Sequence, residues 1–260
     1  MVPTCLFQCG ILSRGRIDLT VRWCIDEVTT IIMADTDFVA FLKALLAAQE
    51  RDVQTAAILT LGNLCRSDAN ASWWGPYAIP RLVPLLKKEK EDELDIVPRT
   101  HASLGCCRNV VQVATNWQLF LEQDVLAQYE REDLLSSAVP AICQNAVSLL
   151  KTLVQRAPTL FAGAVADHHR KLWSGLLLHV HHATAQSSSK PQQEAISLEA
   201  ARCMVSCLSH TTDSEHVQRL WQHGGEAAAT LLCNSTHARL QEEGREAKRK
   251  IDSLHHHNGQ

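Results

Sequence analysis

Cysteines and histidines at helical spacing are the residues that could bind a metal ion. Cys203, Cys207 and His210 follow an i, i+4, i+7 pattern, which places them on one face of a helix. A structural zinc site normally has four N or S ligands, and no fourth ligand is evident. We therefore interpret the two cysteines as core residues and expect neither a metal nor another cofactor.

A second set of histidines is spaced so that its members spread around a helix, and we expect them at the solvated surface. The set comprises His168, His169, His179, His181 and His182. A Gly-rich phosphate loop, paired carboxylates in a cleft pattern and a nucleophile elbow are all missing from the sequence. We therefore expect no catalysis of covalent chemistry.

Polar residues recur near the ends of predicted helices and could bind a partner protein. Asn63 and Asn109 are 46 residues apart, and Gln155 and Ser209 occupy corresponding places. An Asn side chain both donates and accepts hydrogen bonds, so such a row can pair with a partner backbone. The alternative is that these residues cap or bond neighbouring helices. The full predicted partner-binding site comprises Asn63, Arg66, Ser67, Arg108, Asn109, Gln155 and Ser209.

An acidic segment between residues 122 and 133 is a second candidate for partner binding. Five acids and one base, Arg131, give it a local net charge of about −4. The segment is either a docking patch for a basic tail or a solvated turn between helices. Its acids are Glu122, Asp124, Glu130, Glu132 and Asp133.

The elements that position these residues are predicted to be helices. The chain has 260 residues, of which 46% are hydrophobic and 20% charged, with 11 glycines and 8 prolines. Apolar residues between Val53 and Leu64 follow the 3.6-residue period. A shorter helix covers 38–46, with Asp35, Thr36 or Asp37 as its N-cap, and Asp68 or Asn70 is expected to cap the helix after Leu64. Within each later unit we expect a short helix, a medium helix and a long helix; the first short one covers 71–76 and the medium one starts at Ile79.

The helical unit repeats with a period near 46 residues, which is typical of armadillo or HEAT arrays, and three helices per unit favour armadillo. We predict an all-α armadillo-type α-solenoid, a right-handed superhelix of about four repeats plus a partial fifth. A polar insert at 184–191 lengthens the fourth repeat. The repeats lie near 34–78, 79–124, 125–168, 169–224 and 225–254, between an unassigned segment (1–33) and a polar tail (255–260).

Charge and hydropathy exclude two further classes. The formal net charge is −3 and the pI is about 6.5, whereas nucleic-acid binders normally carry a basic excess. No run of 18 apolar residues exists, so we expect no membrane span. The ten cysteines are dispersed and predicted to be reduced thiols in a cytosolic protein, where the sequons at Asn70 and Asn234 would not be glycosylated.

The segment 54–70, QTAAILTLGNLCRSDAN, resembles an armadillo repeat of the small-G-protein GDP dissociation stimulators (SmgGDS). The resemblance continues at 107–110 (CRNV), 149–153 (LLKTL), 208–210 (LSH) and 222–225 (QHGG), and covers roughly residues 34–250, the C-terminal half of that family. It implies binding of Rho- or Rap-like small GTPases with polybasic, prenylated C-termini and promotion of GDP release. The family groove asparagines correspond to Asn63 and, one turn later, to Ser67, where this chain departs from the pattern.

The resemblance also implies a cytosolic protein that can associate with the endoplasmic reticulum or mitochondria. The N-terminal repeats that carry the family's acidic patch and prenyl pocket are missing here. The resemblance therefore implies that the chain binds the GTPase, without implying full nucleotide-exchange activity. Two alternatives are open: a generic armadillo scaffold that binds extended peptides, and a fragment without independent activity.

Overall fold

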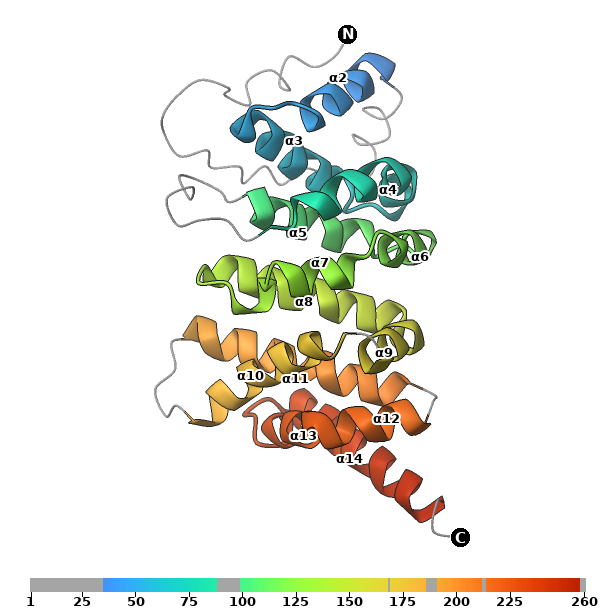
Figure 1. Cartoon of the computed structure of the whole chain (residues 1–260), viewed down its shortest axis with the longest axis vertical. Helices are drawn as coiled ribbons and strands as arrows, with labels where there is room; N and C mark the ends of the chain where they lie inside the picture. Colours follow the sequence, from blue (N-terminus) through green and yellow to red (C-terminus); the bar gives the residue numbers. More distant parts are fainter. Residues whose placement is uncertain (1–34, 88–98, 168, 186–190, 212–213, 258–260) are drawn as a thin grey trace.

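The computed structural model describes residues 35–87, 99–167, 169–185, 191–211 and 214–257. In these ranges all the regular secondary structure is helical, and the helices stack from one end of an elongated molecule to the other (Figure 1). The predictions for 1–33, for most of the insert at 184–191 and for the last three residues lie outside the described ranges.

The helices follow one another in a recurring order. The first two are α2 (Thr36–Leu46) and α3 (Arg51–Leu64). Next come α4 (Asp68–Leu82), η2 (Val83–Leu85), α5 (Arg99–Val110), α6 (Thr115–Glu122), α7 (Val125–Arg131), η4 (Leu134–Ser136) and α8 (Pro140–Arg156). The last are α9 (Pro158–Asp167), α10 (Arg170–Ala185), α11 (Pro191–His210), α12 (Ser214–Leu220), the π-type turn η5 (Trp221–Gly225), α13 (Glu226–Cys233) and α14 (Ala238–His257).

The N-cap of α2 lies where the sequence predicted it, whereas the N-cap predicted for α4 is wrong. The Asp35 carboxylate accepts hydrogen bonds from the N–H groups of Asp37 and Phe38, so Asp35 is the N-cap. At α4 the N-cap position belongs to Ser67, and Asp68 is already helical. Asn70 is buried inside α4, where its Nδ2 donates to the Leu64 carbonyl at 3.1 Å. It therefore closes the end of α3 instead of capping α4.

Helix α4 is continuous, whereas the sequence pattern predicted a short helix at 71–76 and a new one from Ile79. Pro76 and Pro80 both lie inside it. A proline there removes one backbone donor and normally disfavours the helix. The buried residues of α4, from Ala71 and Trp74 to Leu82, form one apolar face whose burial offsets that cost.

The helices α3, α5, α8, α11 and α14, here called the third helices, pack against one another in that order. Helices α4, α6, α9 and α12 lie along one edge of the stack (Figure 1). Each unit thus buries its apolar face mainly against the next, as in a solenoid. Helix α14 extends to His257, so the first three residues of the predicted polar tail are helical. In the described part of the chain no helix is both long and apolar enough to cross a membrane.

Candidate partner-binding face

Half-buried polar side chains connect each third helix to the next along one surface, which we call the third-helix face. Between α3 and α5, Arg99 Nη1 donates to Gln54 Oε1 at 3.0 Å. Between α5 and α8, Asn145 Nδ2 lies 3.1 Å from His101 Nδ1 and 3.3 Å from the His101 carbonyl oxygen. Such bonds hold neighbouring units in register and are partly open to solvent.

The connections continue toward the C-terminus with charged groups. Lys151 Nζ and Ser148 Oγ, both on α8, donate to the Glu199 carboxylate of α11, at 2.5 and 3.2 Å. The Arg202 guanidinium makes a bidentate pair with the Glu243 carboxylate of α14, at 2.9 and 3.0 Å. These acids are therefore neutralised by neighbours within the face.

The predicted row of Asn63, Asn109, Gln155 and Ser209 lies at the ends of four consecutive third helices. Asn63 and Gln155 are exposed. Asn109 is half-buried, and its Nδ2 donates to the Gly62 carbonyl at 2.8 Å, which is the helix-joining alternative. The carbonyl of Ser209 accepts from Lys250 Nζ at 2.8 Å, so the end of α11 is closed by α14.

Basic side chains stand beside this row. Arg66 is exposed after α3, Arg108 is half-buried in the last turn of α5, and Ser67 is the N-cap residue of α4. Sequence reasoning missed Arg156, which is exposed at the end of α8 next to Gln155. Its position directly after Gln155, the third residue of the row, was the available signal. A cation at a helix C-terminus is favoured by the partial negative charge there.

The predicted acidic segment divides into exposed and internally bonded residues. Glu122 and Asp124 are exposed, and Asp133 is exposed with a left-handed backbone (φ 49°). Glu130 instead turns toward α10, where its Oε1 accepts from the Leu172 N–H and its Oε2 lies 3.3 Å from His169 Nδ1. Glu130 thus binds the first turn of α10, a favourable place for a carboxylate.

The candidate metal residues do not converge. Cys203 and Cys207 are buried, whereas His210 is exposed and its Nδ1 lies 2.8 Å from the Ser206 carbonyl oxygen. No group of three metal-ligating side chains occurs within the described ranges. Burial raises the pKa of the Cys207 thiol to about 12, which keeps it protonated.

The prediction of solvated histidines is wrong for His179. Its side chain is buried, and its Nε2 lies 2.7 Å from the Leu135 carbonyl oxygen and 3.3 Å from Cys143 Sγ. The helix α10 turns this residue toward η4 and α8, and a polar partner at hydrogen-bonding distance allows the burial. His169 is half-buried against Glu130 and His181 is exposed, while the side chains of His168 and His182 lie outside the description.

Comparison with known proteins bears on the fold. No protein-family model matches the chain, and no curated protein does. A designed armadillo repeat protein superposes with a TM-score of 0.69 at 16% identity, over 87% of this chain and 85% of that chain. An engineered protein superposes with a TM-score of 0.67 at 19% identity, over 87% and 85%. Another designed armadillo repeat protein, solved in complex with the peptide (KR)4, gives a TM-score of 0.63 at 17% identity, over 86% and 85%.

Identities this low show the fold alone. The described helices and these neighbours together define an armadillo-type α-solenoid, which confirms the predicted fold class. Membership of the GDP dissociation stimulator family stays a prediction.

Proposed function

We propose that the chain is a protein-interaction scaffold, not a catalyst, which binds an extended polypeptide along the third-helix face. Armadillo-type solenoids present such elongated surfaces because successive units repeat the same helices. A designed neighbour with this fold was solved with a peptide, which supports the proposal.

Unpaired charge on the third-helix face supports a partner that carries acidic side chains. Arg66, Arg108 and Arg156 stand at the ends of α3, α5 and α8, and no ion pair or hydrogen bond joins their guanidinium groups to another described residue. Glu199 and Glu243, which join α8 to α11 and α11 to α14, are already paired. The free charge at the C-terminal ends of α3, α5 and α8 is therefore positive, which is the single observation that carries the preference.

The exposed amide of Asn63 adds a donor and an acceptor for the partner backbone beside Arg66. Backbone contacts of this kind do not depend on sequence, whereas the guanidinium groups select carboxylates by charge and geometry. We infer that the partner segment is extended and carries Asp or Glu at intervals. A basic segment such as (KR)4 is expected to bind more weakly.

The test measures the fluorescence anisotropy of labelled peptides titrated with the full chain. The probes are an Asp/Glu-rich octapeptide and the peptide (KR)4. We expect the acidic probe to bind, and the double variant Arg66→Gln/Arg156→Gln to weaken its binding by at least about tenfold. Lys87→Gln removes an exposed charge outside this face and serves as the control. Preferential binding of (KR)4, or equal loss in the control, would contradict the proposal.

A folded Rho- or Rap-type GTPase is the second candidate partner, and it is supported by the sequence resemblance over residues 34–250. The same row would contact it, with Arg66 and Arg108 pairing with surface carboxylates. The chain would then promote GDP release or act as a chaperone for the GTPase. Titration with a GDP-loaded Rho or Rap protein separates the candidates, because a peptide scaffold binds the acidic octapeptide and not the folded GTPase.

A further inference from the structure

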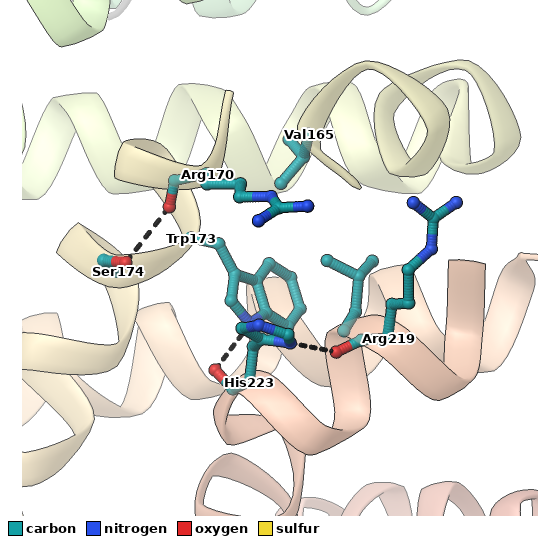
Figure 2. Close-up of a pocket in the computed structure, with 7 residues that line it drawn as sticks. Val165, Arg170, Trp173, Ser174, Arg219 and His223 are labelled. Carbon is teal, nitrogen blue, oxygen red and sulfur yellow. Dashed lines mark hydrogen bonds between the residues drawn. The ribbon is translucent and has the colours of Figure 1, made fainter. Parts of the chain in front are cut away.

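An open hollow lies away from the third-helix face, between α9, α10, α12 and η5 (Figure 2). Its floor is the buried indole of Trp173, and Val165 and Leu220 complete the apolar wall. Trp173 Nε1 donates to the His223 carbonyl at 3.0 Å, which fixes the floor against η5. The hollow therefore has a defined shape.

The rim of this hollow is basic. Arg170 extends into it from α10 and Arg219 rises beside it from α12 (Figure 2). His223 and Ser174 add an imidazole and a hydroxyl. The Arg170 guanidinium makes no ion pair or hydrogen bond with another described residue. Arg219 has Glu215 at 3.6 Å, one turn earlier on the same helix, and the Glu215 carboxylate is 81% exposed.

The start of α10 does not itself supply the anion site. Glu130 already accepts from the Leu172 N–H in the first turn of the helix. Binding would depend on the side-chain donors, the two guanidinium groups above all. A guanidinium presents paired N–H donors that match the oxygens of phosphate or carboxylate. An apolar floor beneath these donors strengthens the interaction by excluding water.

We propose that this hollow binds a phosphate group, held by Arg170 and Arg219 over the Trp173 floor. The phosphate has two possible sources, inorganic phosphate and a phosphorylated side chain of a partner segment. The site is independent of the third-helix face, so a partner could contact both.

The experiment is isothermal titration of the full chain with two probes, inorganic phosphate and a short peptide that contains one phosphoserine, each in a chloride buffer. Binding of both probes with similar affinity indicates free phosphate as the ligand. Binding of the phosphopeptide at least about tenfold tighter than phosphate, and absence of binding by the unphosphorylated peptide, indicates a modified partner. Failure of both probes to bind overturns the proposal.

Matched variants test the position of the site. Arg170→Gln removes an exposed guanidinium, so we expect the variant to fold normally. It should weaken binding of the phosphate probe by at least about tenfold. Lys171→Gln removes the same charge from the next residue, which is exposed and does not line the hollow. An equal loss in both variants would show diffuse attraction to a basic surface and overturn the assignment. Arg219→Gln is a second variant, to be interpreted together with its circular dichroism.

Discussion

The side-chain nitrogen of Asn109 lies 2.8 Å from the carbonyl oxygen of Gly62, so the last turn of α5 is tied to the last turn of α3. Gly62 faces α5 closely enough that a Cβ there would meet Cys106 Cα at 3.4 Å. The close approach of the two helices is what allows the short Asn109 side chain to span them. Its counterpart Asn63, 46 residues earlier, is exposed.

This difference predicts opposite behaviour of two similar variants. Asn109→Ala leaves the Gly62 carbonyl without its partner and should lower the free energy of unfolding by about 1–2 kcal/mol. Asn63→Ala should change it by less than about 0.5 kcal/mol while weakening partner binding. Urea unfolding and peptide affinity, measured on both variants, check the pair. Equal destabilisation by Asn63→Ala would make Asn63 a structural residue.

Gly75 is required because Asn116 occupies the space of a side chain. Asn116 is fully buried, and its Nδ2 donates to the carbonyls of Ala71 and Val110 at 2.9 and 2.8 Å. A Cβ on Gly75 would clash with the Asn116 amide. Gly75→Ala should therefore destabilise the fold by at least about 2 kcal/mol, as measured by thermal and urea unfolding.

Gly105→Ala is the control for this prediction. A Cβ at Gly105 would meet Asn145 Nδ2 at 3.8 Å, an ordinary contact. Replacing a helical glycine by alanine normally stabilises by roughly 0.5–1 kcal/mol. A neutral or stabilising effect of Gly75→Ala would mean that Asn116 moves without cost.

The helices and their repeat could be predicted from the sequence because apolar residues recur with two periods. One is the 3.6-residue period of a helix, and the other is the 46-residue period of the repeat. The 46-residue spacing that links Asn63 with Asn109 also links Asn70 with Asn116, and each residue of the second pair bonds a carbonyl six positions earlier. That role was missed, since a bond from inside one helix to the end of the preceding helix leaves no local signal.

The burial of His179 and the basic hollow could not be predicted from the sequence either. His179 is buried by Leu135, 44 positions away in the chain, so its helix alone gives no indication. Arg170 and Arg219 belong to different helices and meet only when the units stack. Charge and spacing identify the candidates, but the tertiary packing decides which of them remain exposed.

The core thiols should make stability fall at alkaline pH. Burial raises the pKa of Cys65 and Cys143 to about 12, whereas an unfolded thiol titrates near 8.5. The folded state therefore holds more protons above pH 8.5, and the stabilisation present below that pH is lost as pH rises toward 12. Each thiol contributes a slope of up to about 1.4 kcal/mol per pH unit. Urea unfolding between pH 7 and 11 measures it, and Cys143→Ala should reduce the slope.

The same burial predicts selective alkylation. At pH 8 a thiol of pKa near 12 is a thiolate in about one molecule in ten thousand. Cys233 is half-buried, so iodoacetamide should modify it long before Cys143. Peptide mapping by mass spectrometry compares the two rates within one sample. Comparable rates would show that α8 opens readily.

The acidic segment gives a final test, because its members differ in structural role. Glu130 has 18% exposure and binds His169 and the Leu172 N–H, so Glu130→Lys should destabilise α10 and is unsuited to a binding test. Glu122 and Asp124 are exposed, and Asp124 has a left-handed backbone (φ 56°) that Asn also tolerates, so Glu122→Lys/Asp124→Asn should leave the melting temperature nearly unchanged. If the segment guides a polybasic GTPase tail, this double variant should slow association, and the effect should shrink as salt shortens the screening length below about 8 Å. Stopped-flow association with a GDP-loaded Rho or Rap protein measures both effects. An on-rate equal to that of the unmodified chain at low salt would assign these residues to a solvated turn.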